Sequence, residues 1–431
     1  MYAVLKGTHD IILDEADYYS YIEEVLTRVC ISHNYREFRT PIIESSDLFL
    51  RSVGDSTDIV RKEMYTFLDK GERSITLRPE ITAGCVRSMV NAKLFANMDY
   101  PVKAYYLGPN FRYERPQKGR YRQFLQFGVE CVGSTSPYRD AEVIIMFNNA
   151  LKMLGFNNLK LKINSLGDEE TRINYKKALN EYFGQYIDSM CEDCKERYKT
   201  NILRILDCKV EADREIIGKA PKLSDFYSDE SKKYFDSVLS LLDKVGVEYE
   251  IDNTLVRGLD YYTGVVFEYH YTSKSGQNYG ALGGGGHYGK LVKELGGPDL
   301  EGVGCAFGIE RLASVMKDDN LLEGIEQGLD LYIMPLGEEA RESCFILSNF
   351  LSLNGYSNDV CLESKNFSQM FKKAERRRAK YAIIVGENEI KNDEVVIKNL
   401  ATQEQTNVKN SDLIEYLDEE FGEHDHEHEE E

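Results

Sequence analysis

The most constraining feature of this 431-residue chain is the stretch from Tyr105 to Val132, YYLGPNFRYERPQKGRYRQFLQFGVECV. Apolar and aromatic residues at strand-like spacing are followed by Gly108-Pro109 and then by a basic segment. After this segment comes a run in which polar and apolar residues alternate. The pattern predicts a strand, a long charged loop and a second strand. In the second strand Gln126, Gly128 and Glu130 are two residues apart and therefore lie on one face of the sheet.

A sheet face with an amide, a glycine and a carboxylate can hold a small zwitterion, while a nearby guanidinium grips a phosphate. The loop supplies five basic side chains: Arg112, Arg115, Lys118, Arg120 and Arg122. The alternative is an edge hairpin with a solvated basic loop. Residues elsewhere in the chain are needed to decide between a ligand site and an edge hairpin.

The length predicts two or three domains, one with a large core. The net charge of -20 argues against a nucleic-acid partner, but nine acidic residues and no basic ones lie from Asp418 to Glu431. Removing these nine charges from -20 leaves about -11 on the remainder of the chain. The segment from Lys372 to Lys380 is strongly basic, so it or the loop after Arg112 could meet a polyanion. A solvated helix face is the alternative for that segment.

The sequence predicts a cytosolic protein. Its first residues do not resemble a signal peptide, and it has no apolar run long enough to span a bilayer. Nine scattered cysteines, an odd number, do not form the pattern of a disulfide framework and fit a reducing compartment.

Other polar residues lie where strands end. Glu80 and Thr82 lie at a predicted strand-to-helix turn, although Glu80 could simply complement the helix dipole. Arg257 is followed closely by Tyr261 and Tyr262, which places a cation near aromatic walls. Arg311 lies in the first turn of a predicted helix, where a cation is unfavourable unless something anionic offsets it.

Two further patterns are incomplete. Gly284, Gly289 and Lys290 approach a phosphate-binding loop, but Leu291 replaces the hydroxyl residue, so the glycines instead allow close approach of a ligand or a packed strand. The predicted helical insertion from about 168 to 226 holds Cys191, Cys194 and Cys208, which raise the possibility of zinc. No fourth cysteine or histidine is near, so we favour small buried cysteines and predict no metal site.

The chain resembles class II aminoacyl-tRNA synthetases, and specifically their histidyl form. YREFRTPIIE looks like motif 1, GPNFRYERPQKGRYRQFLQFGVE like motif 2 and GCAFGIERL like motif 3. TLRPEIT and LVRGLDYYTGVVFEY resemble segments distinctive of the histidyl enzymes. One departure is His287-Tyr288-Gly289, where similar proteins usually have Arg and Asp around the tyrosine.

The resemblance implies an α+β fold with a six-stranded antiparallel sheet flanked by helices, and a homodimer formed through motif 1. It implies a catalytic domain over residues 1–325 and an α/β anticodon-binding domain over 326–416. The acidic composition of residues 417–431 separately predicts a disordered tail. The implied activity is ATP-dependent charging of tRNA(His) with histidine. ATP and Mg²⁺ are the expected cofactors, and no membrane is involved.

The resemblance also assigns roles to residues. For the phosphates, Arg112 would hold the α-phosphate, Arg257 would lie between the α-phosphate and the histidine carboxylate, and Arg311 would bind the γ-phosphate. The remaining expected contacts are Glu80, Thr82 and Gln126 to the α-ammonium, Glu130 and Tyr262 to the imidazole with Tyr261 beside them, and Arg115, Gln117 and Arg122 to the tRNA acceptor end.

Two other functions remain possible. One is the histidine-binding regulatory subunit of ATP phosphoribosyltransferase, which lacks the anticodon domain and tends to lose the catalytic cations. The other is a synthetase of the same subclass for another amino acid, against which the pairing of Glu130 with Tyr262 argues.

Overall fold

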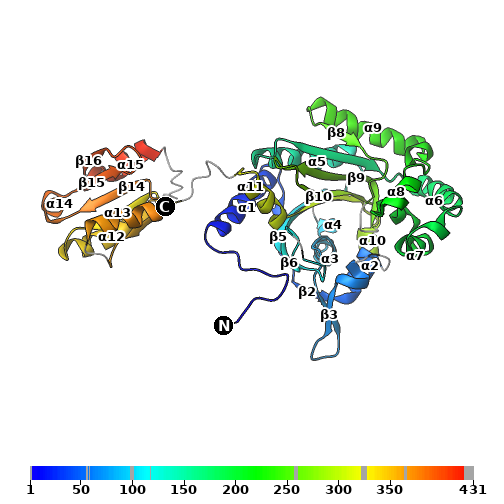
Figure 1. Ribbon diagram of the computed structural model, residues 1–431, viewed down its shortest axis with the longest axis horizontal. Coiled ribbons are helices and arrows are strands. Elements are labelled where there is room, and N and C mark those ends of the chain that lie inside the picture. The colour runs from blue at the N-terminus through cyan, green and yellow to red at the C-terminus, as the bar shows by residue number, and fades with distance from the viewer. Residues whose placement is uncertain are drawn as a thin grey trace. The chain divides into compact units, whose positions relative to one another are not determined.

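The computed structural model describes residues 2–54, 57, 59–97, 101–116, 118–256, 261–321, 328–363 and 366–421. The chain forms two compact units, Met1–Glu323 and Gly324–Glu431 (Figure 1). The boundary predicted from the sequence lies after residue 325.

The first unit is built on a large sheet with the strand order β1-β5-β6-β11-β10-β9-β7-β8. The strands are β1 (Arg36–Glu37), β5 (Val102–Phe111), β6 (Gln123–Val132), β7 (Leu159–Ser165), β8 (Tyr249–Ile251), β9 (Tyr262–Thr272), β10 (Asn278–Tyr288) and β11 (Gly302–Gly308). The six central strands all pair antiparallel, which confirms the expected sheet. β1 and β8 add parallel edges that are too short for a periodic pattern to reveal.

The two faces of this sheet differ because side chains alternate along each strand. On one face, Phe127 and Phe307 pack against Phe147 of α5 (Pro137–Met153). Helix α5 contacts α1 (Asp14–Ser32) and α9 (Asp229–Lys244), and α1 contacts α11 (Ile309–Asp318). This helical layer leaves the opposite face, which carries Gln126 and Glu130, available for a site.

The motif 1 segment is divided between two sheets. Arg36–Glu37 (β1) joins the large sheet, whereas β2 (Ile43–Ser45) joins a small sheet of order β2-β4-β3 with β4 (Ser74–Leu77) and β3 (Tyr65–Leu68). Pro41 lies between the two pieces, and a proline cannot donate a ladder hydrogen bond. Strands β3 and β4 form an antiparallel hairpin.

Short helices surround the small sheet and the cavity described below: α2 (Ser46–Val53), the π-helix η1 (Ile59–Glu63), α3 (Thr82–Asn91), α4 (Leu94–Asn97) and α10 (Leu291–Glu294). The insertion after β7 is helical, as expected, with α6 (Glu169–Phe183), η2 (Ile187–Ser189), α7 (Glu192–Thr200), η3 (Ile202–Asp207), α8 (Glu211–Ile217) and η4 (Leu223–Phe226). Its buried side chains join the hydrophobic core between the large sheet and α3.

The second unit has a mixed sheet with the order β13-β12-β14-β15-β16. Its elements are β12 (Leu331–Pro335), α12 (Glu339–Leu353), β13 (Asn358–Val360), α13 (Phe367–Arg376), β14 (Tyr381–Val385), α14 (Glu387–Asn392), β15 (Glu394–Asn399), β16 (Gln405–Lys409), η5 (Asn410–Asp412) and α15 (Leu413–Phe421). The sheet is mixed because β12 pairs in parallel with β13 and β14, whereas β15 and β16 run antiparallel. The connection between β14 and β15 is too short for a parallel crossover.

The start of the acidic tail also needs correction. Residues 417–421, assigned to the tail, belong to α15, where Leu417 is fully buried and Phe421 packs against Tyr356 and Tyr381. Residues 422–431 lie outside the described residues. Within the described part of the chain, every helix is too short or too polar to cross a membrane.

Candidate active site

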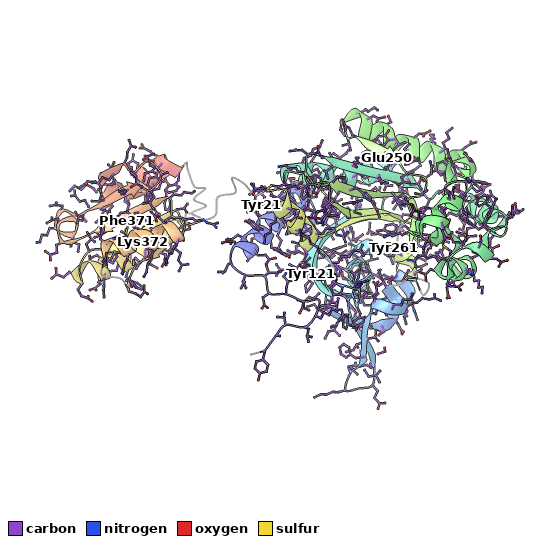
Figure 2. The ribbon with its side chains drawn as sticks, in the orientation of Figure 1. Tyr21, Tyr121, Glu250, Tyr261, Phe371 and Lys372 are labelled. Carbon is purple, nitrogen blue, oxygen red and sulfur yellow. The ribbon has the colours of Figure 1, made fainter. Side chains whose placement is uncertain are left out.

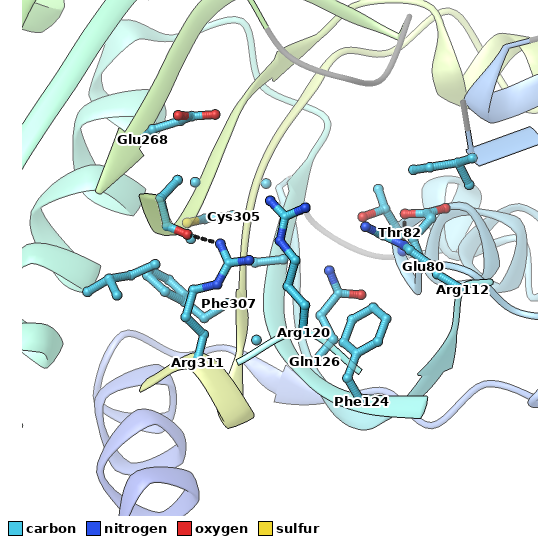
Figure 3. A pocket seen from close by; sticks show the side chains of 18 of the residues that line it. Glu80, Thr82, Arg112, Arg120, Phe124, Gln126, Glu268, Cys305, Phe307 and Arg311 are labelled. Carbon is cyan, nitrogen blue, oxygen red and sulfur yellow. Dashed lines mark hydrogen bonds between the residues drawn. The ribbon is translucent and has the colours of Figure 1, made fainter. Parts of the chain in front are cut away.

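A cavity of about 400 Å³ lies on the open face of the large sheet (Figure 3). Eight of the residues chosen from the sequence line it: Glu80, Thr82, Arg112, Gln126, Glu130, Tyr261, Tyr262 and Arg311. They come from the turn before α3, the end of β5, β6, the start of β9 and the first turn of α11. The fold therefore brings distant parts of the chain to one place.

Three guanidinium groups, those of Arg112, Arg120 and Arg311, line this cavity. The Nε of Arg112 donates to the carbonyl oxygen of Pro79 at 2.8 Å, and its guanidinium lies 5.2 Å from the centroid of the Phe124 ring. Burial, followed by the positive charge of Arg120, lowers the pKa of Arg311 to about 10, and Arg112 adds to the effect. Cations that destabilise one another in this way favour binding of a polyanion between them.

Glu130 is a buried carboxylate, 1% exposed, in the same cavity. The hydroxyl of Tyr288 donates to its Oε2 at 2.8 Å, and the hydroxyl of Tyr106 donates to its Oε1 at 3.1 Å. Burial raises the pKa of Glu130 to about 8 in spite of these hydrogen bonds. A cationic or N–H-bearing ligand would compensate for the cost of burying this charge.

Glycines make room for Glu130 and its neighbours. Gly304 lies opposite Glu130 in the pairing of β6 with β11, and a Cβ on Gly304 would stand 2.2 Å from Oε2 of Glu130. A Cβ on Gly285 would stand 1.8 Å from the carbonyl oxygen of Gly304. The glycines of β10 were predicted to allow close approach of a ligand or a packed strand. At Gly285, it is the neighbouring strand β11 that packs closely.

Glu80 caps a helix and also lines the cavity. Its carboxylate accepts hydrogen bonds from the backbone N–H groups of Thr82 at 2.9 Å and Ala83 at 2.8 Å, in the first turn of α3. This is the helix-end geometry that the sequence left open. Burial raises the pKa of Glu80 although these N–H groups act against it, so a nearby ammonium group would still be favourable.

Two residues expected at the tRNA acceptor end, Arg115 and Arg122, lie apart from the cavity lining. Arg115 is exposed, and the guanidinium of Arg122 lies 3.8 Å from the centroid of the Tyr113 ring. Gln117 and Arg257 lie outside the described residues, so their predicted roles stay predictions.

Three cavity residues were missed or left without a role: Arg120, Tyr288 and Glu310. Tyr106, which donates to Glu130 from behind the lining, was missed as well. Tyr106 pairs with Gly128 across β5 and β6, so strand alternation could have placed it on the site face. Glu310 precedes Arg311 in α11; its Oε1 accepts the N–H of Leu125 at 2.7 Å, and burial raises its pKa to about 7. No local pattern in the sequence indicates Glu310.

His287 points away from the cavity, whereas its neighbour Tyr288 points into it, because adjacent residues of β10 face opposite sides. Its Nδ1 lies 3.1 Å from Oδ1 of Asp140 and its Nε2 lies 2.9 Å from Oε2 of Glu301. Burial acts to lower the pKa of His287, but Asp140 and Glu301 outweigh it and raise the pKa to about 10. The departure at His287-Tyr288-Gly289 therefore builds an ion pair behind the site.

His287→Gln is expected to remove a pH-dependent part of the stability. A histidine whose pKa is raised on folding stabilises the protein fully below about pH 6.5 and loses this contribution as the pH rises through about 10. The contribution is roughly 3 to 5 kcal/mol. Urea unfolding at pH 6.5, 8 and 9.5 should show wild type losing its advantage over the variant, whereas a constant difference would contradict the ion pair.

The comparisons with known proteins agree with this geometry. The family model described as histidyl-tRNA synthetase matches residues 7–312. The histidine–tRNA ligase 1 of Shouchella clausii (strain KSM-K16) is 47% identical over 416 residues, which cover 96% of this chain and 98% of the relative. This chain belongs to the histidyl-tRNA synthetase family.

Other members support the same assignment. The histidine–tRNA ligase of Geobacillus sp. (strain WCH70) is 44% identical over 421 residues, covering 97% of this chain and 99% of the relative. The crystal structure of apo S. aureus histidyl-tRNA synthetase superposes with a TM-score of 0.80 at 39% identity, covering 97% and 100% of the two chains. The model of the anticodon binding domain matches residues 330–420, within the second unit.

Proposed function

We propose that this protein uses ATP to join histidine to tRNA(His) through a histidyl-adenylate, releasing pyrophosphate and then AMP. One observation carries the proposal: Arg112, Arg120, Arg311 and the tyrosine-bound Glu130 line one cavity. A triphosphate and a small nitrogen-containing ligand can therefore lie side by side. Family membership supports the same activity.

Histidine is held at Glu130. The carboxylate accepts one imidazole N–H, and Tyr262 packs against the imidazole ring. The ring centroids of Tyr261 and Tyr262 are 4.7 Å apart, so Tyr261 supports Tyr262. Glu80, Thr82 and Gln126 receive the α-ammonium group at the rim formed by α3 and β6. An amino acid without ring nitrogens would leave buried polar groups of the site unpaired, which lowers its kcat/KM by ~10⁴-fold or more relative to histidine.

Adenylate formation is attack of a histidine carboxylate oxygen on the α-phosphorus of ATP, with pyrophosphate leaving. Negative charge increases around that phosphorus, and fixed cations stabilise it. Arg112, held by a hydrogen bond to the carbonyl oxygen of Pro79, contacts the α-phosphate. Arg311 binds the γ-phosphate, and Arg257 lies between the α-phosphate and the histidine carboxylate and contacts both. In the second step, the terminal ribose 3′-hydroxyl of the tRNA attacks the adenylate and AMP leaves.

The residues present also fit Mg²⁺. Carboxylates of Glu268 and Glu310 line the cavity. Within the described residues, the buried Oε2 of Glu310 has no hydrogen-bond partner. Oxygen ligands of this kind suit magnesium, which when bound would neutralise phosphate charge.

The tRNA is bound by basic surfaces in both units. Arg115, Gln117 and Arg122 of the motif 2 loop approach the acceptor end. In the second unit, α13 and the turn after it expose basic side chains that include Arg376, Arg377 and Arg378, and Lys372 lies on the same helix (Figure 2 labels Lys372). This basic surface is available for phosphates of the anticodon arm.

The active form is a homodimer in the cytoplasm. Ile42 and Ile43 of the motif 1 segment and Phe67 and Leu68 of the neighbouring hairpin are exposed apolar side chains that a second copy could cover. All nine cysteines lie in the described residues and none forms a disulfide there, which suits a reducing compartment.

Pyrophosphate exchange measured with each of the twenty amino acids tests this function. We expect exchange with histidine alone. Exchange with a different amino acid would show that this amino acid, and not histidine, is the substrate. If none of the twenty amino acids supports exchange but histidine still binds, the protein is better explained as the regulatory subunit of ATP phosphoribosyltransferase. Against that alternative, the chain keeps the catalytic cations and the anticodon-binding domain.

A further inference from the structure

Four side chains of the helical insertion come together at a point that has no part in the catalytic cavity: Cys191, Cys194, Cys208 and Asp213. Their three sulfur atoms and a carboxylate oxygen all lie within 4.8 Å of one another. The Sγ atoms of Cys191 and Cys208 are 3.8 Å apart, and Sγ of Cys208 is 3.3 Å from Oδ2 of Asp213.

We propose that these four residues bind a structural Zn²⁺ ion. Zinc takes four ligands in a tetrahedron with Zn–S bonds of ~2.3 Å, so two thiolates on one zinc lie ~3.8 Å apart. The separation of Cys191 from Cys208 equals that edge. Three thiolates and one carboxylate are ligands that zinc accepts, and a closed set of four protein ligands is typical of a structural site.

The surroundings also suit a metal site. Cys194 is fully buried, and Cys208 and Asp213 are 7% and 2% exposed. The backbone N–H of Cys191 donates to both oxygens of Asp213, at 3.3 Å and 3.2 Å, which orients the carboxylate toward the thiols. Cys191 and Cys194 lie at the start of the nine-residue α7, where the helix dipole favours thiolates.

A disulfide and an iron–sulfur cluster both fit these four side chains less well. A disulfide between Cys191 and Cys208 would require an S–S distance of ~2.05 Å and would leave Cys194 beside a buried carboxylate. An iron–sulfur cluster holds its thiolates on separate irons, whereas these four ligand atoms surround a space suited to one ion.

The ion would connect three segments of the insertion: the N-terminus of α7, the residue after η3, and α8. These segments are short helices, and a metal supplies folding free energy to small units of this kind. From α7, Glu196 reaches Arg61 of η1 at 3.1 Å, and η1 contributes Ile59 and Glu63 to the catalytic cavity. The zinc site therefore stabilises the part of the insertion that contacts the cavity wall.

Metal content of the full-length protein, purified under reducing conditions without chelator, tests the proposal. Elemental analysis should find ~1 zinc per chain and no stoichiometric iron. Cys194→Ser should lose the zinc, whereas Cys344→Ser, a change at an equally buried cysteine of α12, should keep it. Equal zinc in both variants, or no zinc in wild type after incubation with Zn²⁺, would overturn the proposal.

Asp213→Asn tests the fourth ligand with little change in shape. Against a chromogenic chelator, this variant should bind zinc at least ~10-fold more weakly than wild type, because it loses the anionic ligand. If Cys194→Ser does not fold, titrating wild-type thiols with a mercurial reagent should release the zinc. Unchanged affinity in Asp213→Asn, or a Cys191–Cys208 disulfide detected by mass spectrometry of freshly prepared protein, would contradict the site.

Discussion

Arg112→Ala is expected to lower the rate of histidine-dependent pyrophosphate exchange by ~10²- to 10³-fold. The guanidinium is held by Pro79 and lies over Phe124, so it is positioned before the reaction begins. A group fixed in this way stabilises the charge that develops at the α-phosphorus without reorganisation, and alanine removes it. The loss should fall on the exchange rate more than on the KM for histidine.

Two further variants show whether the effect depends on geometry. Arg112→Lys keeps the charge but loses the planar fork, so it should recover only part of the rate. Arg73→Ala, at an exposed arginine in the turn between β3 and β4, should exchange at the wild-type rate. An Arg112→Ala protein as active as Arg73→Ala would show that Arg112 does not contact the reacting phosphate.

Glu130→Gln is expected to raise the KM for histidine by ~10²-fold and to leave the KM for ATP almost unchanged. A hydrogen bond between a buried charged group and its ligand contributes ~1.5 to 3 kcal/mol, and the neutral amide oxygen accepts an imidazole N–H more weakly than the carboxylate does. The amide would also present an N–H₂ group to a hydroxyl of Tyr106 or Tyr288 that now donates to Glu130. Steady-state exchange kinetics with varied histidine and ATP measure both effects.

Tyr288→Phe is a milder change at the same site and is expected to have a smaller effect than Glu130→Gln. It removes one of the two hydroxyl donors and keeps the carboxylate, so the KM for histidine should rise by less, ~10-fold. A Glu130→Gln protein that binds histidine normally but ATP weakly would assign this carboxylate to the nucleotide instead.

Much of the candidate site could be predicted because strand alternation is a local rule. The two-residue spacing of Gln126, Gly128 and Glu130 determines which face they share, and Gln126 and Glu130 line the cavity. The resemblance of the three motifs added Arg112 and Arg311, which lie far apart in the chain. Tyr288 was missed because its contact with Glu130 depends on how β10 and β11 align with β6.

The sequence by itself determined the strands on either side of the motif 2 loop, the helical character of the insertion and the chemical types of the site residues, since periodicity and residue chemistry are local properties. The tertiary structure decided which distant residues meet. It brought Tyr288 of β10 to Glu130 of β6, gave the second sheet an antiparallel hairpin, and brought Asp213 to three cysteines. Such contacts depend on strand order and helix packing over long sequence separations, which local spacing does not specify.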